Sequence, residues 1–201
     1  YRHRVRQAAR GSCSARSMED LLAEAKSAGV SLDFPIYSEA LKCYADAEDW
    51  QRVDRCLDAM ERGGCPARVE SFAVLINACA RRRDLKRAEA FWSRAIRDSL
   101  RPTLSLANAL LKAAARAGDI ETLERRLFSM RQAFDLSPDI ISYNTLVGAY
   151  AEKGDIAGAH AVLDKITAAK LKPNAFTYTP LIRAAATPDE AEALLRRMIE
   201  E

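Results

Sequence analysis

The sequence lacks the residue clusters on which most catalytic and metal sites are built. Its two histidines, His3 and His160, lie far apart, and it contains neither a glycine-rich phosphate loop nor a metal-ligand cluster. Its five cysteines are an odd number without a CxxC pair, which disfavours a disulfide framework or a zinc site and fits a reducing compartment. We therefore expect no enzyme activity, no metal, no cofactor and no small-molecule substrate.

Long apolar runs and helix-breaking residues are also scarce. No apolar run approaches the roughly 18 residues that span a bilayer, which predicts no membrane insertion. Only eight glycines and seven prolines occur in 201 residues, while Ala, Leu, Arg and Glu are abundant, and this bias favours helix. A hydrophobic fraction of 49% is enough for a continuous core and argues against disorder.

The net charge is small, at +3. A balance this close to neutral does not demand a polyanionic partner, although local patches can still attract one. Two basic clusters stand out, one formed by Arg2, Arg4, Arg6 and Arg10 and the other within residues 81–87. Each is interpreted either as a solvated helix face or as a contact for an anionic partner.

A repeat of about 35 residues runs through the whole chain. Equivalent positions recur at intervals of 35, 35, 36 and 35 residues at Tyr37, Phe72, Ala107, Tyr143 and Tyr178. Two further series keep the same step, namely Asp49, Asp84, Asp119 and Asp155, and Met60, Ala95, Met130 and Ile166. A period in this range predicts a solenoid, because one unit cannot bury its apolar face alone and must stack on its neighbours.

Each unit is predicted to be a pair of antiparallel helices, most clearly over residues 142–174. The apolar residues of 142–152 recur at i, i+3, i+4 and i+7, which is typical of an amphipathic helix. Gly154 ends this helix, Asp155 caps the start of the second, and Pro173 closes the unit.

This pattern predicts a single array over residues 1–201. Its approximate units are 1–33, 34–68, 69–103, 104–139, 140–174 and 175–201. Residues 1–10 are predicted as a worn first helix, 11–14 as a turn and 17–28 as the second helix of the first unit. The first 18 residues resemble a transit peptide in their Arg and Ser content, but they are in phase with the repeat. Any targeting segment is therefore expected upstream of Tyr1.

Residues 140–174, IISYNTLVGAYAEKGDIAGAHAVLDKITAAKLKPN, closely resemble a pentatricopeptide repeat. The SYNTL opening, the KGD turn and the KPN close carry the resemblance, which extends over nearly all of the chain and is strongest over 104–182. The competing tetratricopeptide repeat has a 34-residue step and a W-x-x-L-G-x-x-Y pattern, and neither occurs here. The resemblance implies an all-α, right-handed α-solenoid of about six helix-turn-helix repeats.

Pentatricopeptide proteins are typically organellar and read single-stranded RNA at about one base per repeat. The resemblance implies that a polar side chain at the fifth position of each unit meets the base edge, helped by the last residue of the unit. An aliphatic residue at the second position packs on the base face. Carried onto this chain, Asn144 with Asn174 matches a pyrimidine-reading pair, and Ile141 is the matching clamp.

Other positions match the family less evenly. Asn108 with Asp139 matches a uracil-reading pair, and Thr179 is a purine-type residue whose unit has no closing partner. Arg81 and Arg116 stand near the end of the first helix, where the family often has a basic residue that contacts phosphate. Three reading pairs depart from the family pattern, namely Ser38 with Arg68, Ala73 with Thr103, and His3 with Asp33. The clamp positions depart from it at Pro35, Glu70 and Ser105, and the phosphate positions at Asp46 and Glu152.

Two functions follow as hypotheses. The first is an organellar RNA-binding protein, in the mitochondrion or chloroplast, that contacts a single-stranded transcript through its concave first-helix face in RNA processing, stability or translation. The second is a protein–protein scaffold subunit of a large organellar complex, such as a mitochondrial ribosome or a photosynthetic assembly. The low net charge and the degraded reading positions favour the second, and the intact pairs from residue 104 onward favour the first.

Overall fold

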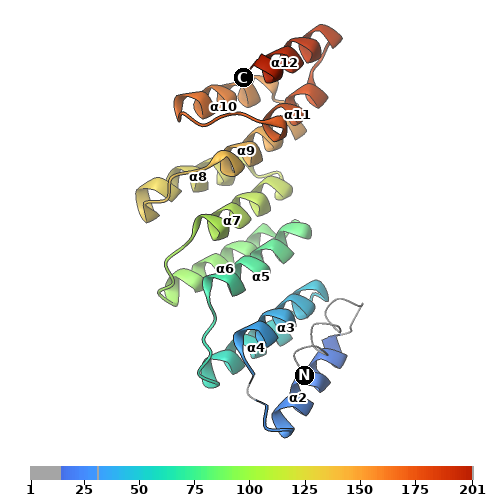
Figure 1. The fold of residues 1–201 in the computed structure, drawn as a ribbon, viewed down its shortest axis with the longest axis vertical. Coiled ribbons are helices and arrows are strands. Elements are labelled where there is room, and N and C mark those ends of the chain that lie inside the picture. Colours follow the sequence, from blue (N-terminus) through green and yellow to red (C-terminus); the bar gives the residue numbers. More distant parts are fainter. Residues whose placement is uncertain (1–14, 31, 201) are drawn as a thin grey trace.

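A computed structural model describes residues 15–30 and 32–200, and this part of the chain is entirely helical, as predicted (Figure 1). The predicted helix at 1–10 and turn at 11–14 lie outside the described residues. The helices are α2 (Ala15–Ser27), α3 (Phe34–Asp46), α4 (Trp50–Arg62), α5 (Val69–Arg81), α6 (Leu85–Arg97), α7 (Leu104–Ala117), α8 (Ile120–Phe134), α9 (Ile140–Glu152), α10 (Ile156–Ala168), α11 (Ala175–Ala184) and α12 (Pro188–Glu200).

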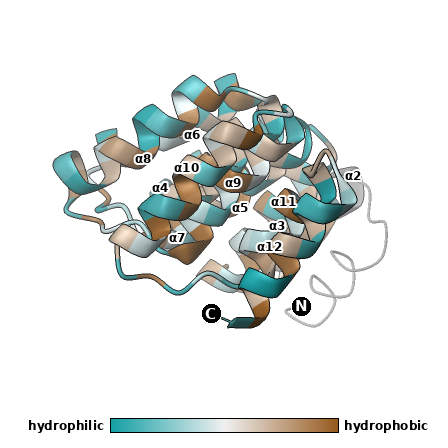
Figure 2. Cartoon of the chain, turned by 90° about the horizontal axis from the view of Figure 1, so that it is seen from above, coloured by the Kyte–Doolittle hydropathy of each residue, from teal (hydrophilic) through white to brown (hydrophobic). Residues whose placement is uncertain are grey.

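The helix pairs stack along the long axis of the molecule, in chain order from α2 to α12 (Figure 1). The first helices of successive units pack on each other, α3 on α5, α5 on α7, α7 on α9 and α9 on α11. Seen along the stack, each helix carries both hydrophilic and hydrophobic segments, as an amphipathic helix must (Figure 2). The result is the predicted all-α repeat solenoid. Over residues 15–30 and 32–200, every helix falls short of the length and hydrophobicity that spanning a bilayer requires.

The residues that keep the repeat register form the core. Met60, Ala95, Met130 and Ile166 are all buried on the second helices, and Tyr37, Phe72, Ala107 and Tyr178 are buried on the first helices. Tyr143 is the exception, because it is half-buried and lines a groove of about 520 Å³ beside Leu127 and Phe128. The fourth unit has one extra residue, and its second helix, α8, is 15 residues long.

The cysteines support the core as apolar side chains. Cys43 and Cys79 are buried among helix residues, as predicted. Burial raises the pKa of the Cys79 thiol to about 12, so this thiol stays protonated at neutral pH.

The repeated aspartates cap the second helices. The side chains of Asp49, Asp84, Asp119 and Asp155 accept hydrogen bonds from the backbone N–H groups of Arg52, Arg87, Thr122 and Gly158 at 3.0, 3.0, 2.9 and 2.8 Å. These bonds confirm the predicted caps. The bond from Thr122 lowers the pKa of the Asp119 carboxyl, and the bond from Arg52 lowers that of Asp49, so both caps stay charged at neutral pH.

The turn between the two helices of a unit needs one residue with positive φ. Gly118 and Gly154 occupy this place at φ +75°, as predicted for Gly154, whereas Glu48 and Arg83 hold it at φ +60° and +58° in the two preceding units. A residue with a Cβ pays about 1 kcal/mol for this conformation. The turns of the two preceding units are therefore more strained than those from residue 104 onward.

Ion pairs join successive second helices. Arg52 of α4 meets Glu19 of α2 at 2.7 Å, Arg126 of α8 meets Glu89 of α6 at 2.8 Å, and Lys165 of α10 meets Glu124 of α8 at 3.9 Å. Arg94 of α6 similarly faces Asp54 of α4 at 3.3 Å. Exposed pairs of this kind contribute little stability each. They place opposite charges in adjacent units.

Two glycines inside helices give a matched test of the packing. A Cβ on Gly148 of α9 would meet nothing within 4 Å, so Gly148→Ala should raise the free energy of unfolding by about 0.5–1 kcal/mol through helix propensity. A Cβ on Gly158 of α10 would lie 2.6 Å from Cδ1 of Tyr150, so Gly158→Ala should lower it by about 1 kcal/mol or more. Urea unfolding followed by circular dichroism measures both. Changes of the same sign in the two variants would contradict this packing.

Candidate nucleic-acid interface

The last residue of each unit begins the first helix of the next unit as its N-cap. Asp139 accepts a hydrogen bond from the backbone N–H of Ser142 at 2.9 Å, and Asn174 accepts one from the N–H of Phe176 at 2.9 Å. Asp33 and Thr103 cap α3 and α7 in the same way. Short polar residues are needed at these positions because they satisfy the free N–H groups of a helix start. The predicted closing residues are therefore held in place by the fold.

The structure brings each predicted pair of polar residues into contact. The Asn108 side chain donates from Nδ2 to Oδ1 of Asp139 at 3.1 Å, although 31 residues separate them. The Asn144 side chain donates from Nδ2 to Oδ1 of Asn174 at 3.2 Å. Each pair joins the fifth position of one first helix to the N-cap of the next. The two pairs therefore present polar groups at equivalent places in successive units.

A buried hydroxyl completes each pair. Oγ of Ser142 donates to Oδ1 of Asn108 at 2.6 Å, and Oγ1 of Thr177 donates to Oδ1 of Asn144 at 2.6 Å. Both hydroxyl residues are fully buried, at 0% exposure, at the third position of a first helix. The sequence prediction did not include them. The sequence did contain a signal for them. A polar residue stands at the third position of each unit that follows a unit with Asn at its fifth position.

Two large apolar side chains stand exposed beside these pairs. Ile141, the predicted clamp, is 58% exposed, and Phe176 is 80% exposed. Both occupy the second position of a first helix, 35 residues apart. Phe176 was missed by the sequence prediction, although its register with Ile141 was visible. The two side chains therefore place exposed apolar surface at the same repeat position in successive units.

Basic side chains lie on the same face, one helical turn after the fifth position. Lys112 lines a cavity of about 370 Å³ together with Asn108, Asp139 and Ile141. Arg183 lines a cavity of about 260 Å³ with Thr179 and Glu152. Each cation follows its fifth-position residue by four residues, which places both on one helix face. Sequence reasoning missed these two cations because it considered only the one repeat position that Arg81 and Arg116 share.

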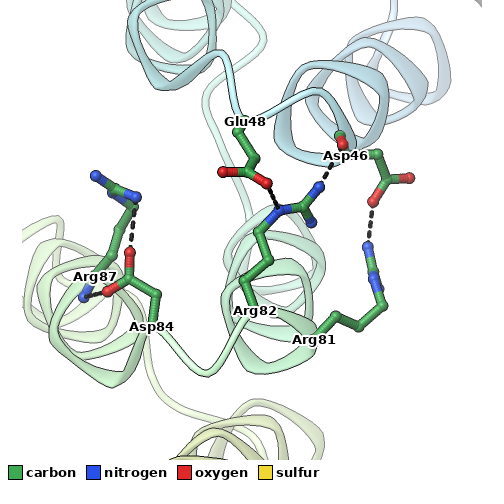
Figure 3. Close-up of polar contacts among 6 residues, drawn as sticks. All are labelled: Asp46, Glu48, Arg81, Arg82, Asp84 and Arg87. Atoms are coloured by element: carbon green, nitrogen blue, oxygen red, sulfur yellow. Dashed lines mark hydrogen bonds and ion pairs between the residues drawn. The ribbon is translucent and has the colours of Figure 1, made fainter.

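The predicted phosphate contacts differ from each other in their surroundings. Arg81 forms an ion pair with Asp46, which stands at the same repeat position one unit earlier (Figure 3). In the same cluster, Arg82 pairs with Glu48 at 2.6 Å and Arg87 with Asp84 at 2.7 Å (Figure 3). Within the described part of the chain, Arg116 is exposed and has no ion-pair partner. Its charge is thus more available than that of Arg81.

The remaining candidates are held locally. Oγ1 of Thr179 donates to the carbonyl of Ala175 in its own helix at 2.6 Å, so this hydroxyl is engaged. His160 lies 3.9 Å from Glu190 at the outer side of the last units. In residues 15–30 and 32–200, no group of three His, Cys, Asp or Glu side chains is placed to hold a metal ion.

Comparison with protein families gives three matches along the chain. The pentatricopeptide repeat domain matches residues 20–82, a PPR repeat matches 70–100, and the PPR repeat family matches 138–187. These matches cover both the more regular and the less regular units.

Relatives of known name come from Arabidopsis thaliana. A chloroplastic pentatricopeptide repeat-containing protein is 27% identical over 73% of this chain and 17% of its own length. The small ribosomal subunit protein mL103 (rPPR7) is 25% identical over 73% of this chain and 35% of its own length. The chain thus spans only about a sixth to a third of the length of these relatives.

Solved structures share the fold. The pentatricopeptide repeat protein PPR10 from maize superposes with a TM-score of 0.78 and 30% identity, over 100% of this chain and 29% of that chain. PPR10 in complex with an 18-nt psaJ RNA element superposes with a TM-score of 0.67 and 18% identity, over 98% of this chain and 34% of that chain. With its helix pairs, its repeat register and matches along most of its length, this chain belongs to the pentatricopeptide repeat family.

Proposed function

We propose that this chain binds single-stranded RNA along the face formed by its first helices, as part of an organellar protein. The observation that carries the proposal is the pair of equivalent networks at Asn108–Asp139 and Asn144–Asn174, each beside an exposed apolar side chain. Splayed RNA bases offer hydrogen-bonding edges to such polar groups and flat faces to such apolar groups.

The two networks suit pyrimidines in different ways. In each network the Asn amide uses one N–H and one oxygen lone pair internally, which leaves an N–H for a base acceptor. The second carboxylate oxygen of Asp139 can accept the N3–H of uracil. Asn174 instead carries an amide nitrogen without a hydrogen-bond partner among the described residues, and it can donate to a pyrimidine carbonyl. Asn108–Asp139 therefore favours uracil, and Asn144–Asn174 accepts a pyrimidine.

Stacking and charge supply the remaining contacts. Ile141 and Phe176 flank the second network in sequence and in register, so a base read by Asn144 lies between them. Stacking of this kind contributes about 1–3 kcal/mol per base. Lys112, Arg116 and Arg183 then meet the phosphates, whereas Arg81 must first exchange its bond to Asp46.

The relatives support an organellar setting. Several of them carry chloroplastic or mitochondrial in their names, and PPR10 is solved with an RNA element. We therefore place the protein in a mitochondrion or chloroplast, with a role in RNA processing, stability or translation. Two base-reading networks give weak binding alone, so high affinity requires further contacts.

A scaffold role is the second candidate. Phe128 is 67% exposed on α8 beside the groove of about 520 Å³, away from the first-helix face. A relative is named as a small ribosomal subunit protein. A protein subunit that covers Phe128 is thus the alternative partner, and it uses a different face from the RNA.

RNA binding tests the proposal directly. Fluorescence anisotropy with a short pyrimidine-rich single-stranded RNA should show binding by the wild-type chain. Replacing both Asn108 and Asn144 by Ala should weaken it about tenfold or more, because two base contacts are lost. Gln132→Ala removes an exposed amide from α8 and should leave the affinity unchanged. No wild-type binding, or equal binding by the double variant, would reject the function.

Two exposed phenylalanines give a matched test of stacking. Phe176→Ala should weaken RNA binding about fivefold or more, through loss of a stacking surface. Phe128→Ala removes a similarly exposed ring from α8 and should not change the RNA affinity. Both variants should keep the thermal unfolding midpoint, since both rings are mostly in water. An equal loss in the two variants would point to non-specific contact instead.

Salt dependence tests the phosphate contacts. Lys112→Gln should reduce the slope of log affinity against log salt by about 0.7, the value for one phosphate contact on a single strand. Arg183→Gln should act similarly. Lys165→Gln removes a cation from α10 that pairs with Glu124 on α8, and it should leave the slope unchanged. A slope that responds to Lys165 as strongly as to Lys112 would contradict the assigned face.

A further inference from the structure

The capping box at the start of α11 is continuous with the amide of Asn144. Thr177 accepts the backbone N–H of Asn174 through Oγ1 at 3.0 Å and donates its hydroxyl proton to Oδ1 of Asn144 at 2.6 Å. Asn174 accepts the N–H of Phe176 at 2.9 Å and the Nδ2–H of Asn144 at 3.2 Å through the same Oδ1 atom. Every partner of the Asn144 amide is thus fixed by backbone groups.

The same arrangement stands at the start of α9. Ser142 accepts the backbone N–H of Asp139 at 3.2 Å, and its hydroxyl reaches Oδ1 of Asn108 at 2.6 Å and Oδ1 of Asp139 at 2.9 Å. The shorter distance favours Asn108 as the acceptor of the single hydroxyl proton. Asp139 also receives the Nδ2–H of Asn108, so the amide is held from both sides.

These contacts decide which way each amide faces. If the Asn144 amide were turned over, its Oδ1 would face Oδ1 of Asn174, and two acceptors would meet without a proton between them. Its Nδ2 would then lie against Thr177, whose hydroxyl could no longer donate to it. A turned amide at Asn108 would set its oxygen against the carboxylate of Asp139. Since a base is recognised by the pattern of donors and acceptors that it meets, amide orientation determines base preference.

The third position varies together with the fifth position of the preceding unit. Ser142 follows Asn108, and Thr177 follows Asn144, whereas the apolar Leu106 follows Ala73. Ala73 has no polar group to orient, and Leu106 is buried. Where the fifth position is Ser38, the third position is Ser71, which is buried and accepts the N–H of Arg68 at 3.3 Å.

We propose that Ser142 and Thr177 are positioning residues for base selection, which hold the amides of Asn108 and Asn144 in one orientation from inside the next unit. The proposal rests on the RNA-binding function proposed above. The hydroxyl groups do not touch the base. They act through the amides, so that each unit depends on its C-terminal neighbour for selectivity as well as for packing.

The test measures base selectivity rather than affinity alone. Binding is measured with single-stranded RNAs of equal length in which one base of a pyrimidine-rich sequence is changed in turn to adenine, cytosine or uracil. In Thr177→Val the ratio of affinities between the preferred and the disfavoured base should fall about three- to tenfold, the value of one hydrogen bond. Ser142→Ala should do the same at the neighbouring base. Thr177→Ser keeps the hydroxyl and should keep the selectivity.

Ser71→Ala is the matched control. It removes an equally buried capping hydroxyl, but the preceding fifth position is Ser38 rather than an Asn, so it should lower the unfolding midpoint without changing base selectivity. The proposal is overturned if Thr177→Val and Ser142→Ala keep the wild-type selectivity, or if they weaken all RNAs equally. If Thr177→Val does not fold, Ser142→Ala decides. Absence of RNA binding by the wild-type chain would instead reject the proposed function, and with it this inference.

Discussion

Each helix pair in this chain has apolar surface toward both of its neighbours, and only stacking removes that surface from water. This constraint explains why the most regular positions of the repeat are buried ones, such as Met60, Ala95, Met130 and Ile166. It also aligns the first helices side by side. Once they are aligned, any polar residue at a fixed repeat position recurs along one face at every unit, which is the spacing that a linear polymer requires.

The residues at the junction between two units serve both the helix start and the proposed contact with RNA. A helix start needs side-chain acceptors for its free N–H groups, and Asp139 and Asn174 provide them. The same two side chains meet Asn108 and Asn144 from the preceding unit. A substitution at a junction therefore changes a helix cap and a proposed base-reading group together. Arg68, whose side chain does not cap α5 in this way, stands in a unit that also lacks an Asn at its fifth position.

Most of the fold could be predicted from the sequence, because it depends on local patterns. The period, the helix pairs and the aspartate caps follow from apolar spacing and capping chemistry, and the structure agrees with them. Tyr143 departs from its series because it lines a groove beside α8 with Leu127 and Phe128, and spacing alone does not describe that groove.

The candidate site was less predictable, because it depends on contacts between units. The pairs Asn108–Asp139 and Asn144–Asn174 came from the family resemblance, and the distances between them came from the structure. The buried hydroxyls of Ser142 and Thr177 could not be placed without knowing which third position meets which fifth position. Phe176 shares the repeat position of Ile141 and Lys112 follows Asn108 by four residues, but neither was predicted.

Many charged side chains form ion pairs with a neighbouring unit, and these pairs change how the basic residues are interpreted. Asp46, Arg81, Arg116 and Glu152 share one repeat position, and the structure pairs the first two. A cation that neutralises a neighbouring unit is less available to a phosphate, because binding must first replace an existing partner. Lys112 and Arg183 instead stand one turn after the fifth position, in the cavities that contain the proposed reading residues. The position of a cation relative to its neighbouring units, rather than its presence in a basic cluster, therefore decides how available it is to the RNA partner proposed above.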